Sequence, residues 1–210
     1  MVEKLFWEDP YQTECEAKVI SINGNEVILD KTVFFAFAGG QASDSGTINN
    51  IEVKQATKKA DEIVYTLENI NFKKKDKVIV KIDEEKRKKI MKLHSAVHIV
   101  FYIFEEIAGS KKIIGSNVTE DKARFDYKTE ESCSDLLEKV QEAANKVFSE
   151  DNKIETYPDP DNPEKKWWEC KDWICPCGGT HVKNTNEIGS VKLKRKNIGA
   201  GKERVEITLI

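Results

Sequence analysis

Apolar and polar positions alternate along much of the first part of the chain, which is the pattern of β-strands. The segment from Glu14 to Asp30 alternates around Asn23-Gly24, a dipeptide typical of tight hairpin turns because both residues tolerate positive φ. A third apolar run, Thr32 to Phe37, ends at two glycines. Further short strands are expected at Ile51–Val53, Ile63–Leu67 and Val78–Ile82. Many short strands separated by turn residues predict a small β-barrel domain over residues 1–85.

The spacing of apolar residues changes at Asp83, which is a plausible helix N-cap followed by two acidic residues. Apolar residues and two histidines then recur at helical spacing from Ile90 to Ala108, and Gly109 ends the run. A second helix is predicted from about Ser134 to Phe148. The spacing therefore predicts a domain that contains helices after about residue 85.

Segments with strand character surround the second helix. They are Gly115–Val118, Ala123–Tyr127, Ile154–Tyr157, Val191–Lys194 and Val205–Ile210. Helices and strands mix here without regular βαβ alternation, which favours an α+β domain over residues 86–210. The fold class predicted for the whole chain is α+β, with the small barrel first.

Charge limits the kinds of partner the protein can have. The chain carries 34 basic and 37 acidic residues and a net charge of −3, which excludes a globally basic coat protein for nucleic acid. Two segments are locally basic: Lys73–Lys89 has nine basic and four acidic residues, and Val182–Ile210 has seven and three. Each is either a phosphate-binding patch or an ordinary solvated face.

The sequence offers no segment for a membrane and no start typical of an export signal. The longest apolar candidate, Ile99–Phe104, is far shorter than a membrane span, and Met1–Asp9 lacks a basic start and an apolar centre. We therefore expect a cytoplasmic protein. The five cysteines are an odd number, and three of them crowd beside a histidine, which favours a metal over disulfides. These three are Cys170, Cys175 and Cys177.

All three histidines of the chain fall into two matching patterns. His94 and His98 are four residues apart in the predicted helix, so their Cβ atoms lie about 5–6 Å apart on one face. Cys177 and His181 repeat that spacing, with a turn expected because Gly178 and Gly179 lie between them. Nitrogen and sulfur donors together favour zinc over magnesium or calcium, and we predict one zinc ion per chain.

The four ligands leave the role of the metal open. A single helical histidine is more often a packed residue than a ligand, but the second pair, with no histidine left over, favours a shared site. Four protein ligands close a tetrahedral zinc, which is typical of structural sites. Either one ligand is loose, or the coordination expands to five, or the ion orients substrate without activating water.

The remaining cysteines and the tryptophans have competing interpretations. Cys175 is an alternative ligand to Cys177, whereas three cysteines are expected in apolar niches: Cys15, Cys133 and Cys170. Three tryptophans precede the glycine turn, and they either pack beneath the metal or stack on a nucleobase. They are Trp167, Trp168 and Trp173.

These residues resemble a known family. A His-x-x-x-His pattern followed by Cys-Gly-Gly-Thr-His-Val-x-Asn-Thr is similar to the editing domain of alanyl-tRNA synthetase and its free-standing AlaX relatives. The segments Gly115-Ser116, Ala123–Tyr127, Glu187–Gly189 and Gly199–Arg204 also match that domain. Gly39–Gly46 resembles the glycine-rich loop of the longer AlaX type, where it belongs to a β-barrel before the editing domain. The resemblance covers nearly the whole chain.

The resemblance implies a hydrolase that removes serine or glycine wrongly esterified to alanine-specific tRNA. It assigns the metal ligands to His94, His98, Cys177 and His181. Five polar residues are candidates for contact with the aminoacyl group or the terminal ribose, and four of them are the predicted catalytic residues: Thr180, Ser116, Gln41 and Asp44. The fifth is Ser43. The implied partner is alanine-specific tRNA at its 3′ aminoacyl end.

Two rival functions remain at this point. The editing domain of threonyl-tRNA synthetase shares both histidine patterns, but it usually has Gly-Pro where this chain has Gly179-Thr180. A module that binds RNA around a closed structural zinc is the rival from another class, and it would leave the ester intact.

Overall fold

The computed structural model describes residues 2–129 and 134–210, so Cys133 lies outside the described residues. The chain divides into two compact units, Met1–Lys88 and Lys89–Ile210. Both units contain sheet, and the long helix α1 (Glu84–Ala108) begins in the first and continues in the second. The observed class is α+β. Within the described ranges, no helix is long and apolar enough to cross a membrane.

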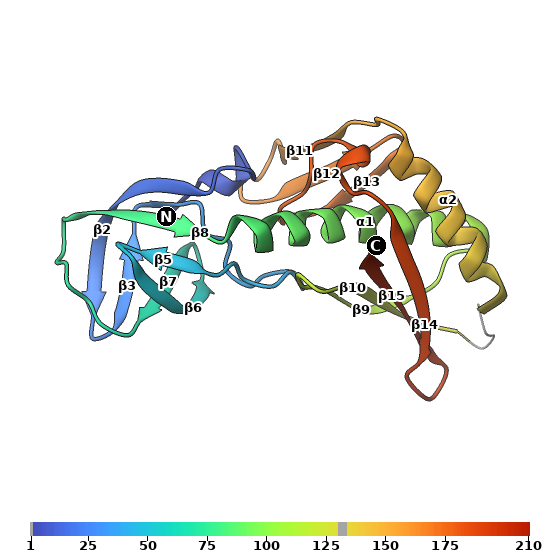
Figure 1. Ribbon diagram of the computed structural model, residues 1–210, viewed down its shortest axis with the longest axis horizontal. Helices are drawn as coiled ribbons and strands as arrows, with labels where there is room; N and C mark the ends of the chain where they lie inside the picture. Colours follow the sequence, from blue (N-terminus) through green and yellow to red (C-terminus); the bar gives the residue numbers. More distant parts are fainter. Residues whose placement is uncertain (1, 130–133) are drawn as a thin grey trace. The chain divides into compact units, whose positions relative to one another are not determined.

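The first unit consists mainly of strands, coloured blue to green in Figure 1. They are β1 (Glu3–Lys4), β2 (Glu14–Asn23), β3 (Glu26–Leu29), β4 (Lys31–Thr32), β5 (Gly46–Ile48), β6 (Ile51–Lys59), β7 (Glu62–Leu67) and β8 (Lys77–Ile82), with a short 3-10 helix η1 (Leu5–Trp7). Strands β2, β3, β7, β6, β5 and β8 pair in this order into a closed ring. Alternate residues of each strand point inward, as in β8, where Val78, Val80 and Ile82 are buried.

The hairpin expected around Asn23-Gly24 forms, but its turn lies one residue further on. Asn23 still pairs with Glu26, so the two loop residues are Gly24 and Asn25. Gly24 has a φ of 61° at the first loop position, which is where a type II′ turn requires glycine.

The prediction of a strand over Thr32–Phe37 was wrong beyond Thr32. Residues 33–36 are buried but irregular, because side chains in place of a neighbouring strand satisfy their backbone. The N–H groups of Phe34, Phe35 and Phe37 donate to side-chain oxygens of Thr32, Asp44 and Ser43, at 2.9, 2.7 and 2.7 Å. An apolar run shows burial, but not which groups accept its hydrogen bonds.

The second unit contains two sheets and two helices. Its strands are β9 (Ile113–Val118), β10 (Ala123–Lys128), β11 (Ile154–Pro158), β12 (Lys166–Cys170), β13 (Trp173–Pro176), β14 (Val191–Asn197) and β15 (Lys202–Leu209). Beside α1 it has α2 (Leu137–Ser149) and the 3-10 helices η2 (Ser134–Leu136) and η3 (Thr185–Glu187). The sheets have the orders β14-β15-β10-β9 and β11-β12-β13, all antiparallel.

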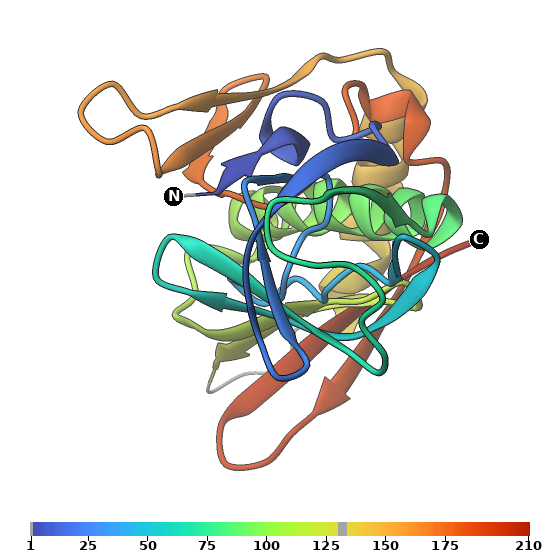
Figure 2. The same ribbon diagram turned by 90° about the vertical axis from the view of Figure 1, so that its left-hand side faces the viewer.

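Helix α1 lies between these two sheets (Figures 1 and 2). It begins as predicted, since the Asp83 carboxylate accepts the N–H of Lys86 at 3.0 Å, and it ends before Gly109, whose φ is 72°. Phe101 and Phe104 contact the ring of Phe125 in the four-stranded sheet. The neighbouring stripe of the helix carries both histidines, and there His98 contacts Trp168 of the three-stranded sheet.

The hairpin β12–β13 was not predicted. Its turn has no glycine or Asn-Gly pair, and Lys171 adopts the left-handed conformation with a φ of 55°. Because the usual turn signal is missing, the sequence gives no mark of this hairpin, although it positions the candidate metal centre.

Candidate metal centre

One turn of α1 brings two imidazoles together. His94 and His98 lie on the same side of the helix, and their ring centroids are 4.9 Å apart with nearly parallel planes. The helix interior behind them is fully buried, with Ile90 and Leu93 at 0% exposure. The predicted spacing is therefore realised on a rigid element.

The Cys177–His181 segment is held against α1 by backbone hydrogen bonds. The Cys177 N–H donates to the carbonyl of Lys166 at 2.8 Å, continuing the edge of β12. The Val182 N–H donates to the hydroxyl of Ser95 at 3.1 Å, and Ser95 is next to His94 on the helix. The turn is thus fixed at both ends, with its thiol and imidazole directed at the helix.

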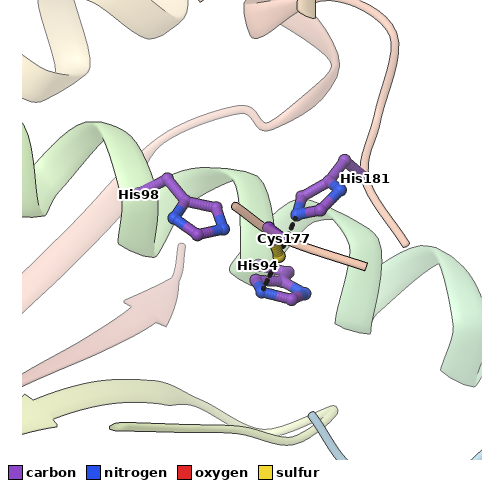
Figure 3. Close-up of side chains that lie close together, drawn as sticks. All are labelled: His94, His98, Cys177 and His181. Carbon is purple, nitrogen blue, oxygen red and sulfur yellow. Dashed lines mark hydrogen bonds between the residues drawn. The ribbon is translucent and has the colours of Figure 1, made fainter. Parts of the chain in front are cut away.

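The four side chains form one cluster (Figure 3). One ligand atom from each lies within 4.8 Å of every other. The Cys177 sulfur is 3.4 Å from His94 Nε2 and 3.5 Å from His181 Nε2. In a tetrahedral site with metal–ligand bonds of the usual length, a sulfur and a nitrogen ligand lie about 3.5 Å apart. The spacing therefore fits a single small metal ion.

The protonation states of the cluster suit metal binding. Burial lowers the pKa of His98 to about 4, and it lowers those of His94 and His181 well below the usual value, with help from the neighbouring imidazoles. The rings are therefore neutral at pH 7 and keep a lone pair for a metal. Burial raises the pKa of the Cys177 thiol to about 12, so binding would release its proton.

Two buried nitrogens of the cluster have no hydrogen-bond partner among the residues that the structure describes. They are Nε2 of His98 and Nδ1 of His181. A buried polar atom without a partner is costly, and an ion at the centre would satisfy His98 Nε2. His94 and His181 are 6% and 3% exposed, whereas His98 and Cys177 are half-buried.

Aromatic rings support His98 from behind. Trp168 is fully buried, and its ring lies 4.7 Å from the ring of His98. Tyr102 stacks between Trp168 and Trp173, and its hydroxyl donates to the carbonyl of Ile174 at 2.6 Å. Of the two interpretations of these tryptophans, packing beneath the cluster applies to Trp168, because a fully buried ring cannot stack on a nucleobase.

Cys175 is not one of the four clustered ligands. Its sulfur lies 3.6 Å from Nδ1 of His98, the ring nitrogen opposite to the orphaned Nε2. A partner on one ring nitrogen orients the other toward a metal. Cys15 and Cys170 are buried, as expected for niche-filling cysteines.

The polar residues predicted to contact substrate lie in different parts of the chain. Thr180 is 1% exposed beside His181. Ser116 pairs with Phe125 across β9 and β10, so its side chain is on the sheet face that meets α1, yet it is exposed. Gln41 is fully buried in the glycine-rich loop, where it pairs with Ala38 across a tight turn whose residues Gly39 and Gly40 both have positive φ.

Asp44 is enclosed in the first unit. Its carboxylate forms an ion pair with Arg87 and accepts the N–H of Phe35 at 2.7 Å, and both charged side chains are almost completely buried. Arg87 also donates to the carbonyls of Pro10 and Val33. Contact between Asp44 and the aminoacyl end stays a prediction; the structure gives a carboxylate that organises its loop.

The motif residues after His181 act on the backbone. Asn184 and Glu187 form a capping box on η3, and Thr185 donates to the carbonyl of Glu150 at 2.8 Å. These residues of the family motif therefore anchor the turn that carries Cys177 and His181. Ser95 and Tyr102 were missed by sequence reasoning, and the only signal for them was their spacing along the histidine helix. Trp168 was among the three tryptophans predicted either to pack beneath the metal or to stack on a nucleobase.

Comparison with known proteins shows the family of the chain. It is 35% identical to the alanyl-tRNA editing protein AlaX-M of Pyrococcus horikoshii, over 100% of this chain and 98% of that protein. The chain belongs to the AlaX family of alanyl-tRNA editing proteins. Within this family, the residues of the metal cluster lie at positions that the sequence resemblance assigned to metal ligands.

Alanine–tRNA ligases are also similar to this AlaX chain. Those of Ignicoccus hospitalis and Methanococcus aeolicus are each 34% identical over 97% and 98% of the chain, which spans only 25% of either ligase. The family model of the threonyl and alanyl tRNA synthetase second additional domain matches residues 169–206, which include Cys177 and His181. A model of class II (A) tRNA synthetases matches residues 4–86.

Proposed function

We propose that the protein hydrolyses the ester of serine, and of glycine, wrongly joined to alanine-specific tRNA, acting in trans in the cytoplasm. Membership of the AlaX family carries this proposal, and the clustered His94, His98, Cys177 and His181 support it. We further propose residues 1–85 as a small barrel domain and residues 86–210 as the editing domain.

We propose zinc as the cofactor, one ion per chain. Three imidazole nitrogens and one thiolate are the donor set that zinc prefers, and their spacing suits tetrahedral coordination. A bound zinc supplies a positive charge that can polarise or anchor the aminoacyl group.

The chain's own groups would position the ester. An aminoacyl ester is an activated acyl group, so holding it beside a water in a preorganised polar site accounts for useful acceleration. We assign Thr180 and Ser116 to contact with the aminoacyl group, since one lies beside the ligand His181 and the other on the sheet face toward the histidine helix. Gln41 and Asp44 are buried, so we assign them to holding the glycine-rich loop in the shape that contacts the terminal ribose.

Two substrates test whether the protein edits alanine-specific or threonine-specific tRNA. Serine is esterified to alanine-specific tRNA and, in parallel, to threonine-specific tRNA, and ester loss is followed with the same zinc-loaded sample. We expect rapid hydrolysis of the first and slow hydrolysis of the second. Faster loss from the threonine-specific tRNA would replace this proposal by threonine-system editing, and a gel shift without ester loss would leave a binding module.

Cys175 provides a test of how the ligands are oriented. Replacing Cys175 by Val removes the partner of His98 Nδ1, and we expect zinc affinity to fall about 10- to 100-fold, the usual effect of losing an outer-shell contact. Affinity is measured by competition with a chromophoric chelator, with Cys15→Ala as the matched control. An unchanged affinity would show that aromatic packing alone orients His98.

A further inference from the structure

One face of the four-stranded sheet is strongly basic. Side chains of β10, β14 and β15 alternate between two faces, and those on one face, such as Phe125 and Val205, are buried toward α1. On the other face, the register aligns Lys196, Arg204 and Asp126 across the strands. The hairpin β14–β15 that carries much of this face is the red pair of strands in Figure 2.

We define the basic face by ten charged residues. Its cations are Lys122, Arg124, Lys128, Lys192, Lys194, Lys196, Lys202 and Arg204, and its carboxylates are Asp126 and Glu206. Eight cations against two carboxylates make this a concentrated positive surface in a chain whose net charge is −3.

The two carboxylates lie beneath the cations. The side chain of Asp126 is 11% exposed and accepts hydrogen bonds from Arg204 at 2.7 and 2.9 Å and from Arg124 at 2.5 Å. The side chain of Glu206 is 8% exposed and binds Lys122 and Lys196. Since each carboxylate is shared by two cations, the solvent meets mainly positive charge.

Several lysines of the basic face form no ion pair in the described part of the chain. Lys128 and Lys202 are exposed and directly opposite one another across β10 and β15, which is a destabilising like-charge pair. Neither these two nor Lys192 and Lys194 pair with a carboxylate among the described residues. An anionic partner would remove the repulsion.

Lysines on an edge strand often serve only to prevent pairing with another sheet, and β14 is an edge strand. Here the first part of that edge is already covered, because Asn145 and Gln141 of α2 accept the N–H groups of Val191 and Leu193. Moreover, Arg124 and Lys202 belong to the inner strands β10 and β15. Edge protection therefore does not explain the basic face.

We propose that the basic face binds the phosphate backbone of the tRNA substrate. This rests on the proposed function and adds to it a contact surface away from the metal cluster. Alternate residues along a strand place cations about 6–7 Å apart, and neighbouring strands repeat the row about 5 Å away. An extended polyanion fits such rows better than a small anion, since the cations are spread and converge on no single point.

The experiment compares two variants that lose the same charge. The first replaces Lys192, Lys194 and Lys202 by Gln; the control replaces three exposed lysines elsewhere in the second unit, Lys139, Lys146 and Lys153. Binding of uncharged alanine-specific tRNA is measured across a range of salt concentrations, and zinc content and melting temperature are recorded. We expect the first variant to bind about tenfold more weakly at low salt, with a salt slope smaller by about 2–3, and the control to bind as the wild type does.

We do not expect the first variant to lose affinity by unfolding. Removing Lys202 relieves its repulsion with Lys128, so the melting temperature of this variant should be unchanged or higher. Equal affinity and salt slope in all three proteins would overturn the basic-face proposal, even if seryl ester hydrolysis by the wild type is rapid. Conversely, loss of binding in the first variant alone supports the basic face even where the wild type hydrolyses no ester, which would overturn the proposed function instead.

Discussion

Replacing Cys177 by Ala is expected to remove the metal and to lower deacylation of seryl-tRNA by at least about a thousandfold, because the loss of an ion that polarises or anchors the reacting group costs several kcal/mol of barrier. The Cys177 sulfur lies 3.4 and 3.5 Å from Nε2 of His94 and of His181, and an alanine side chain has no donor atom to replace it. Metal content by mass spectrometry and single-turnover ester loss are measured on one sample.

The matched control for this prediction is Cys15→Ala, which removes a buried thiol from the first unit and leaves the cluster untouched. It is expected to keep full metal content and near wild-type turnover. His98→Ala should behave as Cys177→Ala does. Full activity in a metal-free Cys177 variant with a normal melting temperature would refute the assignment of the metal centre to catalysis.

Replacing Asp44 by Ala is expected to destabilise the first unit by about 3–5 kcal/mol, since it leaves the buried Arg87 guanidinium without its counter-charge. It also leaves the N–H of Phe35 without its acceptor, because Phe35 lies outside the paired strands in the described part of the chain. The free energy of unfolding is measured by urea titration, with hydrogen exchange used to confirm that the loss falls in residues 2–88. Zinc content should not change.

The double variant Asp44→Leu with Arg87→Met separates the two roles of Asp44. Replacing both members of a buried ion pair by apolar residues is often neutral, so most of the lost stability should return. If deacylation returns with it, Asp44 only organises the loop. If stability returns and deacylation does not, Asp44 contacts the tRNA as the sequence predicts. A loss below about 1 kcal/mol in Asp44→Ala would contradict the ion pair's structural importance.

The site was predictable from the sequence because its ligands obey local rules. Four-residue spacing on a helix brings two side chains together whatever surrounds them, and the N-cap at Asp83 fixed where that helix begins. The chain's three histidines left few ways to form one cluster. The partnership of the His94 pair with the Cys177 pair is long-range. It was predicted from the matching spacing of the two pairs, with no histidine left over, and the family resemblance implied the same four ligands.

The features of the fold and the site that were not predicted depend on contacts between groups distant in sequence. The irregular run over residues 33–36 has the apolar pattern of a strand, but the side chains of Asp44 and Arg87, distant in sequence, satisfy its backbone. The β12–β13 hairpin has no turn signal, since Lys171 adopts positive φ without glycine. The contact of Cys175 with His98 arises only once that hairpin packs on the helix.

The central claim is that this AlaX chain discriminates the wrong amino acid from the right one on the same tRNA. The most direct test charges alanine-specific tRNA with serine, glycine and alanine and follows ester loss with a single zinc-loaded sample. We predict rapid loss of the seryl and glycyl esters and a spared alanyl ester. Loss of all three at one rate, or of none, would contradict the account.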